Sequence, residues 1–389
     1  MQAPLARLEA AIAPHRERLA TPALIIDLDA VDHNVAAMIE RCGGDPRRWR
    51  PHVKTIKQAA LLRRLFDRGV TALKCATLDE LALVLETGEA ADVDVDVLLA
   101  YPLHEAAFRS ASRLASAHPR ARVAFLADSP VHARTMDTWA DGAARPLYLD
   151  VDVGMGRTGT FAPRWSTHAG ALAADLRHFT IAGLHGYDGH LSADDRAAAA
   201  AGYDALCDLA AVFSGLGVAL EEVVTSGSHT YAAALEHAGL GRGPWRHAVS
   251  AGTIVLSDLR CGPAVDDLGL EQAAFVATRV ISADGFRRIT ADAGSKAIAP
   301  DVPAPNCEVV GWPSLHPLTP SEEHLPIRLG GLTAPPLGHL LWLAPSHVCT
   351  TVNLYRVALL IRDHAIVGES PVASGHSLWL SPPQALAAE

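Results

Sequence analysis

Short runs of aliphatic and β-branched residues alternate with longer stretches rich in alanine, leucine and arginine between residues 22 and 230. Short apolar runs bounded by turn residues are typical of buried strands, and the intervening stretches have the length of helices. The alternation predicts repeated strand–helix units around a parallel sheet. The predicted strands are ALIIDL (23–28), RPHVK (50–54), ALKCAT (72–77), VDVLLAY (95–101), RVAFLAD (122–128), PLYLDVDV (146–153), TIAGLHGY (180–187) and EEVVTSG (221–227).

This pattern favours an α/β fold, a (β/α)8 TIM barrel, whose usual span of about 250 residues fits the chain. A doubly wound sheet is the alternative, but no GxGxxG turn follows the first strand. An apolar face that begins after Thr77 predicts a helix, and Ser192 followed by acidic residues predicts the start of another. We expect the barrel to cover residues 21–262.

The pattern changes after about residue 260. Prolines cluster at 299–336, and short β-like runs replace the strand–helix alternation. We expect a second, mostly β domain over residues 263–389, with residues 1–20 packed against it. The β-like runs are AAFVATRVI (273–281), HLLWLAP (339–345) and RVALLIRD (356–363).

Charge and composition limit the classes of binding partner that the chain can have. The chain has 389 residues, and 33 Lys+Arg against 43 Asp+Glu give a net charge of −10 with no basic stripe, which argues against nucleic-acid binding. The sequence shows neither a signal-peptide pattern nor an uncharged apolar stretch of membrane-spanning length. Six scattered cysteines without a CxxC pair fit reduced thiols. We therefore expect a cytoplasmic protein with no membrane partner.

Polar residues gather where the predicted strands end, which is where barrel enzymes place their chemistry. Lys54 ends the second run, and polar segments follow at 150–157, 185–190 and 225–230. A lysine at this position can lose its proton through desolvation and form a Schiff base with an aldehyde. A solvated rim residue is the alternative interpretation of Lys54.

Two turns of small residues could bind a phosphate group. Ser226, Gly227, Ser228 and Thr230 lie at the end of the last predicted strand and just beyond it, and the turn Ser250–Thr253 comes shortly afterwards. Loops after the seventh and eighth strands of such barrels often bind phosphate through backbone N–H groups and hydroxyls. Either turn alone is more typical of a plain loop. Together with Lys54 they indicate pyridoxal phosphate, whose aldehyde needs an amine and whose phosphate needs a cradle.

Several segments, in their order along the chain, give a resemblance to a known family. The sequence resembles the fold-type III pyridoxal-phosphate enzymes, specifically the group of D-serine dehydratase and D-threonine aldolase. The resemblance covers nearly the whole chain. Its carriers are TPALIIDLDAVDHNV, RPHVKT, DVDVGMGRTG, GLHGYDGH, SAGT, DAGSKA (292–297), SEEH (321–324) and PSHVCTTVNLY (345–355).

The resemblance implies roles for individual residues. Lys54 would be the Schiff-base lysine, Arg157 would lie near the cofactor, and Tyr187 would flank the pyridine ring. The phosphate would be held by Ser228, His229, Gly252 and Thr253. Related alanine racemases place an arginine against the pyridine nitrogen where this chain has Ser250. A neutral residue there leaves the nitrogen less protonated and weakens the electron sink.

His347 and Cys349 are candidate metal ligands. On an extended strand, residues i and i+2 face the same side, so an imidazole and a thiolate would converge. This pair suits zinc, with manganese or magnesium as alternatives, and leaves positions open for substrate. Without the resemblance, a buried His and Cys sharing a face by chance is the simpler interpretation. With it, we expect a divalent metal that acts as a Lewis acid on the β-hydroxyl of the substrate.

The resemblance implies a lyase acting on D-β-hydroxy-α-amino acids. A dehydratase would use the freed Lys54 to remove the α-proton and would yield a 2-oxo acid and ammonia. An aldolase would use a base such as His190 on the β-hydroxyl and would yield glycine and an aldehyde. The dehydratases of the group carry His-x-Cys and the aldolases His-x-Asp, so Cys349 favours the dehydratase.

The chain departs from the pattern of the group at Ile56, since members commonly read Lys-Thr-His-Lys at 54–57. Two further functions are less well supported. A racemase needs a second base, which racemase relatives supply as a tyrosine from the start of the β domain, where this chain reads SADGF (282–286). A non-catalytic pyridoxal-phosphate carrier would have no β domain at all. Relatives pair head to tail, so the resemblance also implies a homodimer.

Overall fold

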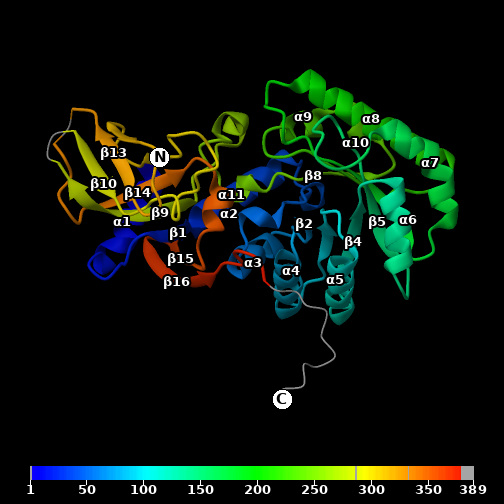
Figure 1. Ribbon diagram of the computed structural model, residues 1–389, viewed down its shortest axis with the longest axis horizontal. Helices are drawn as coiled ribbons and strands as arrows, with labels where there is room; N and C mark the ends of the chain where they lie inside the picture. The colour runs from blue at the N-terminus through cyan, green and yellow to red at the C-terminus, as the bar shows by residue number, and fades with distance from the viewer. Residues whose placement is uncertain (1, 285–286, 332, 378–389) are drawn as a thin grey trace, which may run out of the picture. The chain divides into compact units, whose positions relative to one another are not determined.

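The computed structural model describes residues 2–284, 287–331 and 333–377 (Figure 1). The chain forms two compact units. Among the described residues, we call the unit of residues 42–54, 65–252 and 376–377 the barrel unit, and the unit of residues 2–41, 55–64 and 253–375 the β-rich unit. The boundaries expected from the sequence differ from these, because residues 21–41 and 253–262 lie in the β-rich unit. Residues 378–389 of the expected β domain lie outside the described residues.

The barrel unit contains a parallel sheet in the order β2 to β8. The segment at 49–52 forms isolated parallel bridges on both edges of this sheet, Trp49 with Val249 of β8 and His52 with Lys74 of β2. This segment therefore takes the eighth position and closes the barrel. The strands are β2 (Ala72–Cys75), β3 (Asp96–Leu99), β4 (Arg122–Ala127), β5 (Arg145–Asp150), β6 (Phe179–Gly186), β7 (Glu222–Thr225) and β8 (Arg246–Val249).

The barrel fold is confirmed, but two assignments of strands to it were wrong. The run at 23–28 forms β1 (Ala23–Asp27), which pairs with strands of the β-rich unit and not with the barrel. The last barrel strand is β8, which the sequence analysis did not recognise as a strand. An apolar run shows that a strand forms, but not which sheet it joins.

Helices lie on the outside of the barrel strands in Figure 1. Thr77 caps α4 as expected, because its side chain accepts a hydrogen bond from the Glu80 N–H at 3.1 Å. The helix expected at Ser192 begins later, since Ser192 forms a turn by donating to the Asp195 carboxylate at 2.6 Å. The helices are α4 (Leu78–Ala90), α5 (Glu105–Ala117), α6 (Pro130–Trp139), α7 (Ala162–Asp175), α8 (Arg196–Gly215), α9 (Tyr231–Glu236) and α10 (Ala238–Arg242).

Helix α8 is long and apolar enough to cross a membrane by length and composition alone. Its apolar residues have another explanation here. Tyr203, Leu206, Leu209 and Phe213 of α8 are buried, and the helix contacts α7, α9 and β6 of the same unit. This spacing at intervals of three and four residues is that of a helix packed on a protein core.

An ionic layer lies inside the barrel. The Arg50 guanidinium lies 2.9 Å from the Glu222 carboxylate, and both side chains have no exposed surface. Glu222 also accepts hydrogen bonds from the Tyr148 hydroxyl and from Arg246 Nε, each at 2.8 Å. Asp96 pairs with Arg50 at 3.1 Å. The charges are therefore neutralised by one another, as burial requires.

The β-rich unit is built on a mixed sheet in the order β12-β13-β10-β9-β1-β15-β16, with β14 paired to β9 and β11 to β14. In it, β1 runs parallel to β15 and antiparallel to β9. The other strands are β9 (Ala274–Ala283), β10 (Arg288–Ala291), β11 (Cys307–Val309), β12 (Leu315–Pro317), β13 (Leu325–Leu329), β14 (Leu340–Pro345), β15 (Val357–Arg362) and β16 (Ala365–Pro371). The helices outside the barrel are α1 (Gln2–Ile12), α2 (Leu28–Arg41), α3 (Ala59–Asp67) and α11 (Val348–Val352).

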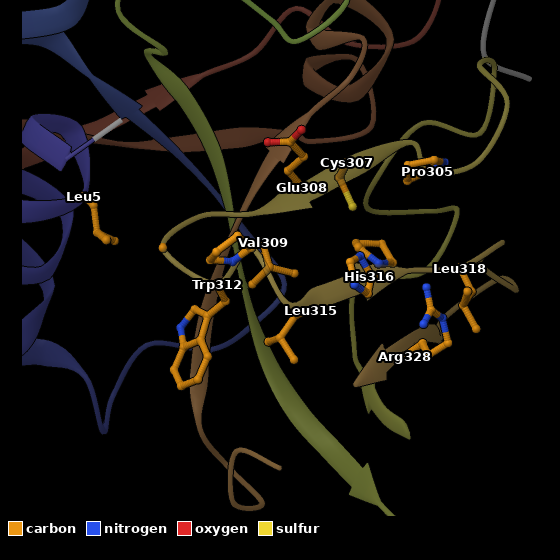
Figure 2. Close-up of a pocket in the computed structure, with 13 residues that line it drawn as sticks. Leu5, Pro305, Cys307, Glu308, Val309, Trp312, Leu315, His316, Leu318 and Arg328 are labelled. Carbon is orange, nitrogen blue, oxygen red and sulfur yellow. The ribbon is translucent and has the colours of Figure 1, made fainter. Parts of the chain in front are cut away.

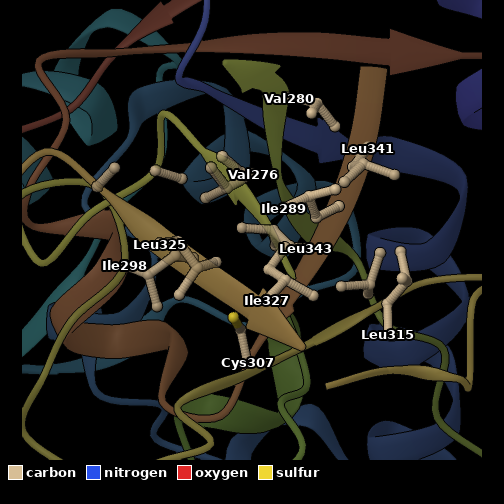
Figure 3. Close-up of a cluster of buried hydrophobic side chains, with 14 of the residues drawn as sticks. Val276, Val280, Ile289, Ile298, Cys307, Leu315, Leu325, Ile327, Leu341 and Leu343 are labelled. Carbon is tan, nitrogen blue, oxygen red and sulfur yellow. The ribbon is translucent and has the colours of Figure 1, made fainter. Parts of the chain in front are cut away.

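Two apolar clusters hold this unit together. In the first, Val276, Ile289, Leu325 and Leu343 pack between strands of the mixed sheet (Figure 3). In the second, α1 packs against the sheet, with Leu8 and Ile12 beside Phe275, Trp342 and Ile25. Residues from the N-terminal helix and from the last third of the chain therefore share one core.

Candidate functional site

A cavity of about 410 Å³ lies at the carboxyl ends of the barrel strands. Its volume is in the range of pockets that bind small molecules. Cationic and aromatic side chains are prominent among the residues around it. It is lined by His52, Lys54, Lys74, Ala76, Ala100, Tyr101, Pro102, Arg157, Thr158, His185 and Tyr187.

A larger cavity of about 590 Å³ lies in the β-rich unit (Figure 2). Its walls are mainly apolar, with Trp312 and Leu315 among them, and Arg328 and His316 lie at one side. This cavity contains no lysine and no predicted site residue. We therefore place the candidate chemistry in the smaller cavity of the barrel unit.

Three cations surround the ring of Tyr187. Lys54 Nζ lies 5.8 Å from the ring centre, Lys74 Nζ 5.3 Å, and the Arg157 guanidinium 4.7 Å. The structure thus brings together Lys54, Arg157 and Tyr187, as the sequence predicted, and adds Lys74. Such a concentration of positive charge attracts an anionic ligand.

Lys54 follows a sharp turn in the chain and does not end a regular strand. It belongs to a short 3-10 helix, Val53–Thr55, and its N–H donates to His52 Nδ1 at 3.2 Å. The side chain is half-buried. The turn therefore directs an amine into the cavity while its backbone stays anchored to the preceding residues.

Behind the cavity, a chain of hydrogen bonds links three buried side chains. The Asp150 carboxylate lies 2.7 Å from His185 Nδ1, and His185 Nε2 lies 3.3 Å from Lys74 Nζ. Thr158 donates to the second Asp150 oxygen at 2.8 Å. Burial lowers the pKa of Lys74 to about 7, and the positive charges of Lys54 and Arg157 contribute.

Lys74 was not among the site residues predicted from the sequence. A lysine in the middle of the apolar run ALKCAT was the available signal, because a lysine is almost never fully buried without a partner. Its side chain is only 2% exposed. The sequence could not show that the Asp150 and His185 side chains lie behind it.

The turn after β7 has a buried hydroxyl free for a ligand. Ser226 Oγ has no hydrogen-bond partner among the described residues, and Ser226 adopts a positive φ of 63°. Thr230 holds the turn, because it accepts from the Gly227 N–H at 3.3 Å and donates to Asp188 at 2.7 Å. Ser228 is buried in the same turn. Unsatisfied buried hydroxyls are rare in proteins, which points to an unseen partner.

Glycine lets the turn at Gly252 approach other backbone and the turn at Gly227 pack closely on the ring of Tyr187. A Cβ atom at Gly252 would lie 2.6 Å from the His52 carbonyl oxygen, and one at Gly227 would lie 3.2 Å from the Tyr187 ring. Ser250 donates to the Arg50 carbonyl at 2.9 Å, so its hydroxyl proton is already used. His229 is half-buried in the turn after β7.

His190 and Thr253 are two further site residues that the sequence predicts. His190 is exposed and does not line the cavity, which leaves its expected part as a base without support from the geometry. Thr253 belongs to the β-rich unit, where its hydroxyl lies 3.6 Å from Cys349 Sγ.

His347 and Cys349 lie close together, although not on a strand as expected. Cys349 is in helix α11, and His347 precedes that helix in an extended conformation. A hydrogen bond to Cys349, together with the Asp301 carboxylate 2.5 Å from His347 Nδ1, raises the pKa of His347 to about 9. The Thr55 hydroxyl lies 3.1 Å from Cys349 Sγ.

This pair forms a small donor set. Among the described residues, no group of three or more His, Cys, Asp or Glu side chains is placed to hold a metal ion. A metal on this pair would therefore have two protein ligands. The carboxylate of Asp301 on one ring nitrogen would leave the other for the metal, which is how metal-binding histidines are commonly oriented.

The barrel cavity fits pyridoxal phosphate. Lys54 and Lys74 supply amines, and Arg157 and Tyr187 form a wall suited to a planar ring. The orphaned Ser226 hydroxyl, in the turn that approaches Tyr187 at Gly227, would suit a phosphate oxygen. A barrel with these features and a β-rich second unit defines the class of barrel-type pyridoxal-phosphate enzymes. The chain belongs to the family of the alanine racemase N-terminal domain, which matches residues 26–252.

A second family description, a putative serine dehydratase domain, matches residues 273–361. The chain is 27% identical to a D-threonine aldolase from an Arthrobacter species, over 90% of this chain and 91% of that protein. It is also 27% identical to the D-threo-3-hydroxyaspartate dehydratase of a Delftia species, over 37% of each.

Solved structures agree with this fold. The D-threonine aldolase of Filomicrobium marinum superposes with a TM-score of 0.80 at 25% identity, covering 91% of this chain and 95% of that one. The Delftia dehydratase superposes with a TM-score of 0.78 at 22% identity, covering 92% and 98%. These comparisons confirm the predicted fold-type III family and the predicted class of enzyme, a pyridoxal-phosphate-dependent lyase.

Proposed function

We propose that the protein cleaves D-β-hydroxy-α-amino acids with pyridoxal phosphate and a divalent metal, and that it acts chiefly as a dehydratase. The observation that carries the proposal is the pair of amines in a cationic cavity whose wall includes Tyr187. The turn after β7, which holds the orphaned Ser226 hydroxyl, approaches the ring of Tyr187 at Gly227. An α-amino acid carries a carboxylate, and the Arg157 guanidinium suits its recognition.

The chain's own residues would divide the work. Lys54 would hold the cofactor and, once released from it, move the α-proton. Ser226, Ser228 and the backbone of the turn after β7 would hold the phosphate, with Gly252 allowing a close approach. When bound, pyridoxal phosphate supplies an electron sink for the bond that breaks at the α-carbon.

The metal is part of the proposal, with zinc favoured by the thiol of Cys349. A metal on His347 and Cys349 would supply a Lewis acid for the β-hydroxyl. Solved structures of D-threo-3-hydroxyaspartate dehydratase include a histidine mutant and a cysteine mutant two positions apart, the latter in a metal-free form. His347 and Cys349 have the same spacing.

A retro-aldol reaction is the second candidate, because the D-threonine aldolase of Arthrobacter matches over most of both chains. D-threonine separates the two reactions. Incubation with pyridoxal phosphate and zinc is expected to yield 2-oxobutyrate and ammonia. Acetaldehyde and glycine would instead establish the aldolase. If neither pair of products forms, the proposed lyase activity is contradicted.

The metal and the oligomeric state need separate measurements. Chelation is expected to abolish turnover and added zinc to restore it, whereas turnover that survives chelation would remove the metal from the proposal. We also propose that the protein is cytoplasmic and that it forms a homodimer. Sedimentation velocity of the purified protein tests the dimer, and a monomer would contradict it.

A further inference from the structure

Lysine is scarce in this protein. The chain contains only four lysines, Lys54, Lys57, Lys74 and Lys296, while arginine supplies the other 29 of its 33 basic residues. Two of the four line the barrel cavity. Arginine cannot lose its proton at physiological pH, whereas lysine can when it is buried. The second amine in the cavity can therefore lose a proton near neutral pH, which the 29 arginines of the chain cannot do.

Lys74 lies deep in that cavity. It extends from β2, its side chain is 2% exposed, and its amine faces both His185 and the ring of Tyr187. A lysine serving only as a surface charge would not occupy such a position.

The partners of Lys74 define its hydrogen bonds. Because Asp150 is a carboxylate, His185 Nδ1 donates to it and Nε2 keeps its lone pair. Nε2 then accepts a hydrogen bond from Lys74 Nζ over 3.3 Å. An unprotonated amine can make this donation and still direct its own lone pair into the cavity.

Some groups around the Lys74 amine favour its charged form and others favour its neutral form. Burial and the cations Lys54 and Arg157 disfavour the charged form, while Asp150 and Asp188 favour it. Burial also lowers the pKa of His185, with the positive charge of Lys74 contributing, so the imidazole stays neutral. An amine with a pKa of about 7 is present in both forms at neutral pH, as an efficient proton-transfer group should be.

We propose that Lys74 is the residue that exchanges a proton with the β-oxygen of the substrate. The inference rests on the proposed function and gives the cavity amine the part that the exposed His190 does not fill. In dehydration, a Lys74 N–H bond breaks and an O–H bond forms while the Cβ–O bond breaks, and its electron pair leaves with water. In retro-aldol cleavage, the hydroxyl O–H bond breaks, its pair stays on oxygen, and the proton joins the Lys74 lone pair.

The first test measures the amine itself and needs no substrate. NMR of the holoenzyme labelled with ¹³C at lysine Cε is expected to show one resonance that titrates near pH 7. Lys74→Met should remove this resonance, and Lys296→Met, which alters an exposed lysine paired with Glu322 and Glu323, should leave it. If the Lys74 resonance titrates only above pH 9, the proposal is wrong, whatever reaction the enzyme catalyses.

The second test measures turnover. Lys74→Met is expected to lower kcat by about 10² to 10⁴, the usual contribution of a general acid or base, while the visible absorbance of the bound cofactor is retained. Lys74→Arg keeps a positive charge but cannot exchange the proton at neutral pH, so its kcat should fall as far.

Recovery of kcat in Lys74→Arg, less than threefold loss in Lys74→Met, or loss of the cofactor band would each overturn the proposal. If the parent enzyme cleaves no D-β-hydroxy amino acid, the proposed function fails, and the NMR result remains to show whether the amine titrates.

Discussion

Lys74 places an ionisable amine where almost no solvent reaches it, and this makes the stability of the fold depend on pH. The pKa of Lys74 is about 7 in the folded protein, against 10.5 for an unperturbed lysine. Between these values the unfolded chain binds a proton that the folded chain does not. The free energy of unfolding therefore rises as the pH increases from about 7 to 10.5, and it falls on acidification.

The variant Lys74→Met should remove the free-energy cost of burying this amine. At pH 7.5 we expect it to raise the free energy of unfolding by about 4 kcal/mol, because the buried amine no longer has to give up a proton. Urea unfolding followed by circular dichroism at pH 7.5 and 9.5 measures the effect. The gain should shrink at the higher pH, and the exposed Lys296→Met should show no gain at either. An equal gain at both pH values would contradict the explanation.

Some site residues could be predicted from type and position, and others could not. Lys54, Arg157 and Tyr187 follow strand ends, so the barrel geometry alone brings them together. The low pKa of Lys74 depends on burial and on charges from three other strands and loops, which no local pattern contains. His190 has the right chemistry and spacing, but the turn that carries it leaves the imidazole in solvent.

At the scale of elements, the ionic layer inside the barrel joins strands that are distant in sequence. Glu222 of β7 contacts Arg50, Tyr148 of β5 and Arg246 of β8, and its side chain has no exposed surface. Removing its charge leaves the Arg50 guanidinium buried with Asp96 as its remaining carboxylate partner. A buried cation without full compensation is strongly destabilising.

We therefore expect Glu222→Gln to lower the free energy of unfolding by about 3 kcal/mol. The adjacent Glu221 is a matched control, because it also pairs with an arginine, Arg122, but its side chain is 57% exposed. Glu221→Gln should cost less than about 1 kcal/mol. Chemical denaturation of both variants at neutral pH makes the comparison, and equal losses would show that burial is not the cause.

The elements themselves were predictable to different degrees. The apolar runs at 273–281, 339–345 and 356–363 correspond to β9, β14 and β15, since alternation and β-branched residues act locally. The sheet that β1 joins is decided by partners more than 200 residues away, so its sequence could not reveal it. The segment around His347 was expected to be extended, but the chain turns into α11 there because Asp258 accepts the Val348 N–H at 3.0 Å.

At the scale of the whole molecule, neither unit is a continuous stretch of chain. The β-rich unit combines residues 1–41 and 55–64 with 253–375, and β1 supplies the strand between β9 and β15. Leu8 and Ile12 of α1 also fill its second apolar cluster. Without β1, two long strands would have unpaired edges.

A fragment of residues 253–375 should therefore fail to fold. Fusing residues 1–41 to its N-terminus through a flexible linker should restore β structure and a cooperative thermal transition, measured by circular dichroism. A linked peptide in which Leu8, Ile12 and Ile25 are replaced by serine is the control and should not rescue. Cooperative unfolding of the 253–375 fragment alone would contradict the shared core.

The pairing of β1 has a consequence during synthesis. Residues 23–27 leave the ribosome early, but β9, the first of their partners, begins at residue 274. At roughly 5 to 20 residues per second, about 250 residues take on the order of 12 to 50 seconds to make. During that interval the barrel strands can associate with one another, while an apolar strand with both edges open waits for its neighbours. The yield of folded protein in a cell will therefore depend on what shields those five residues in the nascent chain, and a slower ribosome or a scarcer chaperone will lower it without changing the stability of the finished molecule.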